Sequence, residues 1–421
     1  MIFGFRSAVK EEAIQNLKPD LRSRFNAMVE HQAITTSIAL VPNQAPTTRV
    51  TDDGMHITHR ETHLDIKRWR HGYLRLCDEV EKEIDSLCGH QDFGLSIPDW
   101  VPDDWACRSR GYSWTKNGTF LKNKRCLIKF LLNDRSLNLG VVDSHGRLEL
   151  NTIAVRDILL KCDSINRKLA LLSLGTAGQL SRITEFVDQQ LTNSIRGRGL
   201  FRDGKDIWIV TRRTKTESVT GKESFIPTKC HPRLSRALEK YLLIIRPLEE
   251  ELAYQLKGKE AYQFYSRNIW MQDCRAMTED DMYGHIGDFL KKYCGVDAGI
   301  QIYRQLCVEI GRVFLGSEFE FEEEKLDVLA AQMGHTARMA RTHYANEVYH
   351  LPAMSSNLLL RFGRISEAWW EVIGFKPGAE PMLPLRKRRK AVHDTGAALL
   401  TEIKDLRKEI RQFKSKRSRC S

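Results

Sequence analysis

The chain has 421 residues, of which 42% are hydrophobic and 9% aromatic, so it can bury the cores of two or three domains and is neither a disordered tail nor a fibre. Its formal net charge of +12 favours acidic partners such as nucleic acid over basic ones. From Gly378 onward there are 13 basic and 5 acidic residues, so most of the surplus lies in a tail and the body is only mildly basic.

The cysteine spacing argues against zinc fingers and a disulfide framework, because no two of the ten cysteines form a C-x-x-C pair. The first residues lack the apolar region of a signal peptide, and no run approaches the roughly 18 apolar residues of a membrane span. We therefore expect a reducing intracellular environment and no membrane partner.

The first part of the chain is predicted to be mainly helical. Helical patterning is interrupted by a polar break over 41–54, and a helix is predicted over 61–87 from apolar residues at spacings of three and four. His56, His59 and His63 have the spacing of one helix face, although their charged surroundings favour a solvated face over a metal site. Further helices are predicted over 117–133 and 152–174.

Two β-rich runs, 205–213 and 223–227, flank a polar connection containing Gly221, which is typical of a hairpin. Helical periodicity then resumes over 232–245, 280–293, 300–315 and 324–333. The expected fold is mainly α with a small antiparallel β-hairpin sheet. We expect a helical N-terminal domain over 1–150, a second domain over 151–375 and a basic helical tail over 376–421.

The tail carries apolar residues at alternating spacings of four and three, which places them on one seam of a helix. That helix could pair with a partner or a second copy, dock on its own body, or fray. The basic run 386–390 could be a nuclear import signal, a phosphate-contacting strip or a solvated linker. The seam consists of Leu399, Ile403, Leu406, Ile410 and Phe413.

Three segments together resemble a known family. Residues 330–347 read AAQMGHTARMARTHYANE, in which Tyr344 follows His335 by nine residues. Upstream, Arg182 precedes an acidic residue by three positions, and Arg304 follows Gln301 by three. In order and spacing these residues resemble the sequence boxes of the tyrosine recombinases, the phage-integrase family, and are most similar to Crypton-type recombinases of fungal mobile elements. The resemblance covers roughly 153–348.

This resemblance implies a helical core-binding domain, a tyrosine-recombinase catalytic domain and a site-specific recombinase or transposase that cuts and rejoins DNA. Tyr344 would attack phosphorus and form a 3′-phosphotyrosine. Arg182, Arg304 and His335 would hold the phosphate, for which the planar, permanently charged guanidinium is suited. A hairpin lysine, Lys215 or else Lys222, would protonate the leaving 5′ oxygen. No metal, ATP or other cofactor is expected.

The same resemblance implies that the partners are double-stranded DNA and further copies of the chain, forming a dimer to tetramer on DNA. Together with the basic run of the tail, it points to the nucleus.

Gln301 departs from the family pattern, which has histidine at that position. Glutamine can donate to a phosphate oxygen but cannot accept and hold a proton as histidine does. This keeps a second hypothesis open, a domesticated DNA-binding protein with a recombinase fold that does not cleave. A type IB topoisomerase-like enzyme, which uses the same residue types on one duplex, is a third. Taken alone, Arg182 and Glu185 also have the spacing of an ordinary ion pair on a helix.

Overall fold

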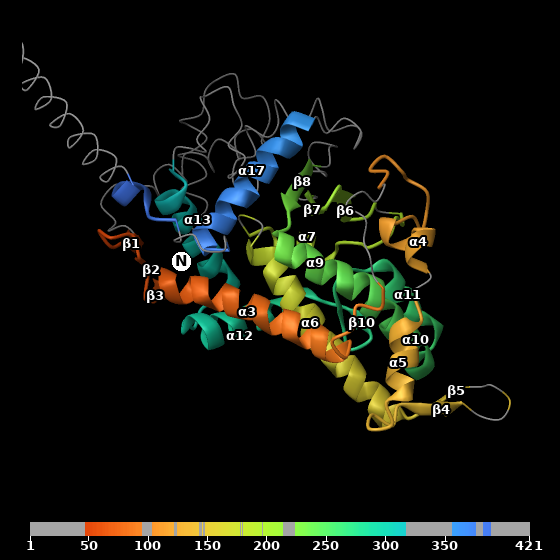
Figure 1. Ribbon diagram of the computed structural model, residues 1–421. Coiled ribbons are helices and arrows are strands. Elements are labelled where there is room, and N and C mark those ends of the chain that lie inside the picture. Colours follow the sequence, from red (N-terminus) through yellow and green to blue (C-terminus); the bar gives the residue numbers. More distant parts are fainter. Residues whose placement is uncertain are drawn as a thin grey trace, which may run out of the picture. The chain divides into compact units, whose positions relative to one another are not determined.

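The computed structural model describes residues 47–94, 103–121, 124–142, 145, 148–176, 178, 180–195, 197–213, 224–316, 356–375 and 382–388. The chain divides into two compact units, residues 1–49 and 50–421, and the description below concerns the second. Strand β1 (Thr48–Val50) crosses that division. The described part is mainly helical with small antiparallel sheets, which confirms the predicted class (Figure 1).

A short hairpin precedes the first described helix. Strand β2 (His56–His59) pairs with β3 (Thr62–Asp65), and Arg60 in the turn has a positive φ of 54°. The prediction of a helix from residue 61 is therefore wrong at its start, and the three histidines lie on strands rather than on one helix face. The reason is that Ile57 and Leu64 alternate with polar residues and are fully buried, a strand pattern that overrides the helical spacing.

Helix α3 (Ile66–Leu87) begins where the side chain of Asp65 accepts hydrogen bonds from the main-chain N–H groups of Lys67 and Arg68. Its apolar stripe is buried, as predicted, and packs against α6 (Thr152–Thr176), which lies where a helix was expected. The stretch 117–133 is not one helix but two short ones, α4 (Gly118–Leu121) and α5 (Cys126–Asn133), after the 3₁₀ turn η1 (Trp114–Lys116). Strands β4 (Gly140–Val142) and β5 (Leu148–Leu150) then form a hairpin.

The predicted hairpin is confirmed and gains a third strand. Strand β7 (Asp206–Arg213) pairs with β8 (Ser224–Lys229), from Trp208 opposite Lys229 to Arg213 opposite Ser224. Strand β6 (Leu200–Asp203) pairs with the other edge of β7, giving the order β6-β7-β8. The inward residues of β7 are buried, so the sheet rests on the helices rather than standing in solvent.

Helices follow the sheet to the end of the described chain. They are α9 (Pro232–Lys240), the π-helical turn η2 (Tyr241–Ile245), α10 (Arg246–Lys257), α11 (Lys259–Arg267), α12 (Glu279–Phe289), the π-helical turn η3 (Leu290–Cys294), α13 (Ile300–Phe314) and α17 (Ser356–Ile373), with a two-residue hairpin of β9 (Met271–Gln272) and β10 (Arg275–Ala276) before α12. The helices predicted over 232–245, 280–293 and 300–315 are thus confirmed. The stretch 324–333 and the tail seam lie outside the described residues.

One hydrophobic core contains residues from both sides of position 150, including Trp69 of α3, Leu169 of α6 and Trp369 of α17. The predicted boundary at residue 150 stays a prediction, while the described residues on its two sides pack together. No described helix is long and apolar enough to cross a membrane.

Candidate functional site

Arg182 stands at the start of the short helix α7 (Ile183–Val187) and is its N-cap residue. The helix is held by Ile183 and Phe186, which are buried, and the ring of Phe186 stacks on Trp270 with centroids 5.0 Å apart. The side chain of Arg182 is 23% exposed, and its Nη1 lies 3.3 Å from Oε1 of Glu185. The ordinary ion pair foreseen from the spacing is therefore formed, with Arg182 still open to solvent on one side.

The end of α6 leads toward Arg182, and the packing of α6 on α3 requires glycine at position 175. A Cβ on Gly175 would lie 1.8 Å from Oη of Tyr73, so only glycine lets α3 and α6 approach this closely. The carbonyl of Gly175 accepts a hydrogen bond from Nε1 of Trp369 at 3.1 Å. Helix α17 therefore lies against the end of α6, close to the segment that carries Arg182.

Helix α13 carries Arg304 and is fixed from its buried face. The hydroxyls of Tyr303 and Tyr73 are 2.6 Å apart, and Nε1 of Trp69 donates to the Tyr303 hydroxyl at 2.9 Å. Both hydroxyls are buried, so this bonded cluster ties α13 to α3 by polar contacts as well as packing. Arg304, the next residue, is thereby held half-buried at the edge of the core, where the apolar stripe had predicted it.

Arg182 and Arg304, 122 positions apart in sequence, lie close enough to interact electrostatically. The pKa of Arg304 is lowered from its ordinary value first by burial and then by the positive charge of Arg182, while Glu185 opposes the shift. Arginine remains charged at any usable pH, and burial is the first cause of the lowering. The smaller contributions of Arg182 and Glu185 indicate that both of these charges lie within electrostatic range of Arg304. An anion placed between the two guanidiniums would relieve that repulsion.

The other predicted site residues have different outcomes. Gln301 is exposed in the first turn of α13, one turn before Arg304. Tyr344, His335, Lys215 and Lys222 lie outside the described residues. The described ends that flank them are well fixed: β7 and β8 are paired up to residues 213 and 224, and the chain leaves α13 at Leu315, which is fully buried, and resumes in α17.

The site elements are also joined to the sheet. Helix α7 packs on β7, and Gln189, just after α7, donates from Nε2 to the hydroxyl of Thr211 on β7 at 2.9 Å. The oxygen of the same amide accepts from Nε1 of Trp270 at 3.0 Å. Since Gln189 is buried, its two bonds set the position of α7 relative to the strand that leads toward Lys215.

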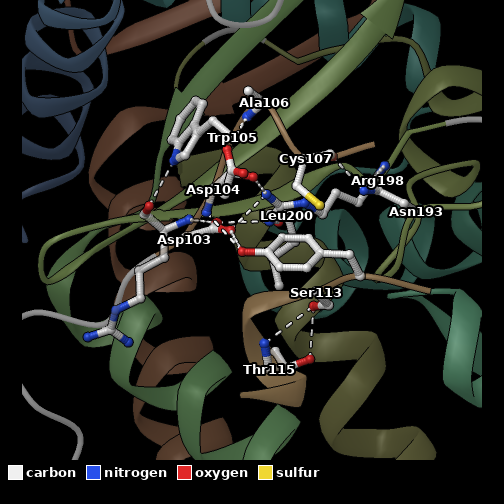
Figure 2. Close-up of polar contacts among 12 residues, drawn as sticks. Asp103, Asp104, Trp105, Ala106, Cys107, Ser113, Thr115, Asn193, Arg198 and Leu200 are labelled. Atoms are coloured by element: carbon white, nitrogen blue, oxygen red, sulfur yellow. Dashed lines mark hydrogen bonds and ion pairs between the residues drawn. The ribbon is translucent and has the colours of Figure 1, made fainter. Parts of the chain in front are cut away.

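A buried ion pair that the sequence did not predict fixes the outer edge of that sheet (Figure 2). Arg198, just before β6, meets Asp103 with Nη2 2.7 Å from Oδ1 and Nη1 2.8 Å from Oδ2, and both side chains are at most 1% exposed. Nη2 of Arg198 also donates to the carbonyl of Asp104, and Oδ2 of Asp103 accepts from the main-chain N–H of Arg202. The segment beginning at residue 103 is thereby pinned along β6.

The same segment contributes an aromatic contact to the sheet. Nε1 of Trp105 donates to the carbonyl of Arg202 at 2.8 Å (Figure 2). The centre of its ring lies 4.6 Å from that of Phe201. Asp103 and Arg198 are 95 positions apart, so no short-range spacing could have announced their pairing. The only local hint of this contact in the sequence is the pair of adjacent acidic residues, Asp103 and Asp104, before Trp105.

The adjacent residues Cys230 and His231, although of types that bind metals, have structural surroundings. Cys230 is fully buried, and His231 caps α9 by accepting from the N–H of Arg233 while its ring stacks on Phe375. Among the residues that the structure describes, no group of three or more histidine, cysteine or acidic side chains could hold a metal ion. The nine described cysteines are free thiols.

Comparison with protein-family models, with curated proteins and with solved structures finds no match to this chain.

Proposed function

We propose that the chain is a DNA strand-breaking and rejoining enzyme of the tyrosine-recombinase type, acting as the recombinase or transposase of a mobile element. The observation that carries the proposal is that Arg182, paired with Glu185, lies within electrostatic range of the half-buried Arg304, because these are the two arginines that the sequence resemblance assigns to one phosphate. Two guanidinium groups that are fixed in place and permanently charged can stabilise the negative charge that develops on a phosphodiester under attack.

In the proposed reaction the phenol oxygen of Tyr344 attacks phosphorus and its proton passes to solvent water, while the bond from phosphorus to the 5′ oxygen breaks. The 3′ phosphate becomes esterified to Tyr344, and the departing 5′ oxygen takes a proton from Lys215 or Lys222. One phosphoester is exchanged for another, so the bond energy is kept for religation. Arg182 and Arg304, with His335, would bear the extra charge on the non-bridging oxygens.

The same proposal includes the other expected properties: binding of duplex DNA through phosphate contacts, assembly of a dimer to tetramer on DNA, and a nuclear location. Arg386, in the basic run, has a side chain that is 79% exposed and pairs only with exposed Asp52 among the described residues. That part of the run is accessible to a phosphate or to an import receptor.

A test uses a nicked duplex carrying candidate target DNA, from which the short 5′-hydroxyl strand diffuses away after cleavage. Wild type should accumulate a covalent protein–DNA adduct on a denaturing gel, and Tyr344→Phe should not. Arg182→Gln and Arg304→Gln should slow adduct formation by roughly 10²–10³-fold each, as loss of one transition-state donor does. Arg312→Gln, an exposed change further along α13, is the matched control and should leave the rate unchanged.

The exposed Gln301 favours the second candidate, a DNA-binding protein that does not cleave. Absence of adduct on DNA that the wild type binds tightly would support this candidate and contradict the first. Gln301→His would then be informative, because restoring a proton acceptor should restore cleavage if only that group is missing.

A further inference from the structure

A second cationic feature lies away from the arginine pair. Helices α3, α6 and α12 and the turn η3 line a pocket of about 300 Å³ that is partly open to solvent. The arrangement of these helices can be followed in Figure 1. Tyr283 of α12 is close enough to Arg304 for its pKa to respond, whereas His285 of α12 lines the pocket. Two positions correspond to about 200° around a helix, so α12 separates the pocket from the arginine pair.

Four cationic side chains line this pocket: Arg167 and Lys168 from α6, and Lys291 and Lys292 from η3. Two of them are already engaged, since Lys168 forms an ion pair with Glu83 and Lys292 donates to the hydroxyl of Tyr293. Among the described residues, Arg167 and Lys291 form no hydrogen bond or ion pair. One carboxylate, the exposed Asp288, also lines the pocket.

The rest of the lining is apolar or neutral. Leu76, Leu171 and Phe289 form a buried wall, and Nε2 of His285 lies 2.5 Å from Oε1 of Gln272. Burial and the charge of Arg167 lower the pKa of His285 to about 4, so the imidazole is neutral at pH 7. The charge of Arg167 acts on the carboxylate of Asp163, four residues before it on α6, without an ion pair between them. The pocket therefore combines two cations outside any ion pair among the described residues with an apolar wall and a neutral ring.

We propose that this pocket binds a phosphate group attached to a small apolar or ring portion, as in a nucleotide. Arg167 and Lys291 would neutralise the phosphate, and the wall of Leu171 and Phe289 would cover the rest of the ligand. The volume lies at the lower end of the range for small-molecule sites, which suits one nucleotide rather than a larger molecule. The inference concerns residues distinct from Arg182 and Arg304 and does not rest on the proposed cleavage.

The phosphate could belong to a free nucleotide or to a strand of DNA, and the experiment separates these sources. Full-length protein is titrated with dAMP by calorimetry and, separately, with a labelled duplex by fluorescence anisotropy, at one fixed salt concentration. Arg167→Gln should weaken dAMP binding about tenfold and the more exposed Lys291→Gln about threefold, while Arg167→Lys retains most of the affinity. The matched control is Lys161→Gln, an exposed lysine on the same helix outside the pocket lining.

If the pocket variants lose affinity for dAMP and the control Lys161→Gln does not, the result supports a free nucleotide as the ligand. Loss confined to the duplex supports recognition of a DNA phosphate at the same pocket. Binding that changes in neither titration, or that falls equally in Lys161→Gln, overturns the proposal. Circular dichroism spectra matching the wild type ensure that the losses come from the pocket and not from unfolding.

Discussion

Replacing Asp103 by alanine tests whether the buried ion pair holds the edge of the central sheet. The carboxylate of Asp103 forms an ion pair with both terminal nitrogens of the Arg198 guanidinium, and it accepts hydrogen bonds from the main-chain N–H of Arg202 and the hydroxyl of Tyr112. All of these are shielded from water, because neither charged side chain is more than 1% exposed. The substitution leaves Arg198 as a buried cation without its counter-charge.

The expected cost follows from these contacts. Hydrogen bonds to a charged group are worth about 1.5–3 kcal/mol each, and the several that Asp103 accepts set an upper range, but Arg198 keeps its bonds to the carbonyls of Leu200 and Asp104. It also keeps the ring of Phe201, 4.2 Å from the centre of the guanidinium. We therefore expect Asp103→Ala to lower the free energy of unfolding by about 3–5 kcal/mol, the range for breaking one side of a buried pair.

The assay is urea unfolding followed by tryptophan fluorescence, to which Trp105 at the same sheet edge contributes. The control Arg312→Ala removes an ion pair whose arginine is 69% exposed and should cost less than about 0.5 kcal/mol. The double variant Asp103→Leu with Arg198→Met removes both charges and should be less destabilised than the sum of its single variants. If Asp103→Ala costs no more than Arg312→Ala, or if the double variant is additive, the reasoning is refuted.

Two further predictions concern packing and pH. Gly175→Ala should lower the free energy of unfolding by about 1–3 kcal/mol, because the new Cβ would overlap the hydroxyl of Tyr73. In the control Gly284→Ala, in α12, the new Cβ meets no atom within 4 Å, so this variant should gain up to about 1 kcal/mol. Thermal unfolding measures both, and equal shifts of the midpoint in the two variants would contradict the prediction. Burial, followed by the charges of Arg233 and Arg236, lowers the pKa of His231 to about 4. As the pH falls, His231 is therefore protonated near pH 6.5 in the unfolded chain but only near pH 4 in the folded protein. The stability contributed by this group is therefore fully present above pH 6.5 and is lost as the pH falls toward 4. Wild type should lose stability over that interval relative to His231→Asn, which keeps a helix-capping oxygen, and parallel pH curves for the two proteins would exclude His231 as the cause.

Local pattern was enough to predict the helices α3, α6, α9, α12 and α13 and the hairpin of β7 and β8, whereas α7, α10, α11 and α17 were not predicted. The apolar stripes of α3 and α13 are physical consequences of burying one face at a period of 3.6 residues, so they can be read before any tertiary contact is known. The hairpin strands could be found because β-rich runs and a polar connection are likewise local. The same reasoning failed over 56–65, where alternating burial of Ile57 and Leu64 decided for strands.

Part of the candidate site was also contained in the sequence. The order and spacing of Arg182, Arg304, His335 and Tyr344 gave the hypothesis, but their spacing along the chain could not bring the first two together. That approach depends on α3, whose Trp69 and Tyr73 hold α13 by hydrogen bonds and accept the closely packed Gly175 of α6.

By itself, the sequence determined several of the helices, the main hairpin, the buried faces of α3 and α13, and which residues are candidates for phosphate chemistry, because these properties follow from local periodicity and residue type. Only the tertiary structure decided that Arg182 approaches Arg304, that Asp103 and Arg198 are buried together, and that Arg167 and Lys291 line one pocket. Each of these depends on contacts between residues roughly 100 or more positions apart, and such contacts are fixed by how whole helices pack rather than by any short-range pattern.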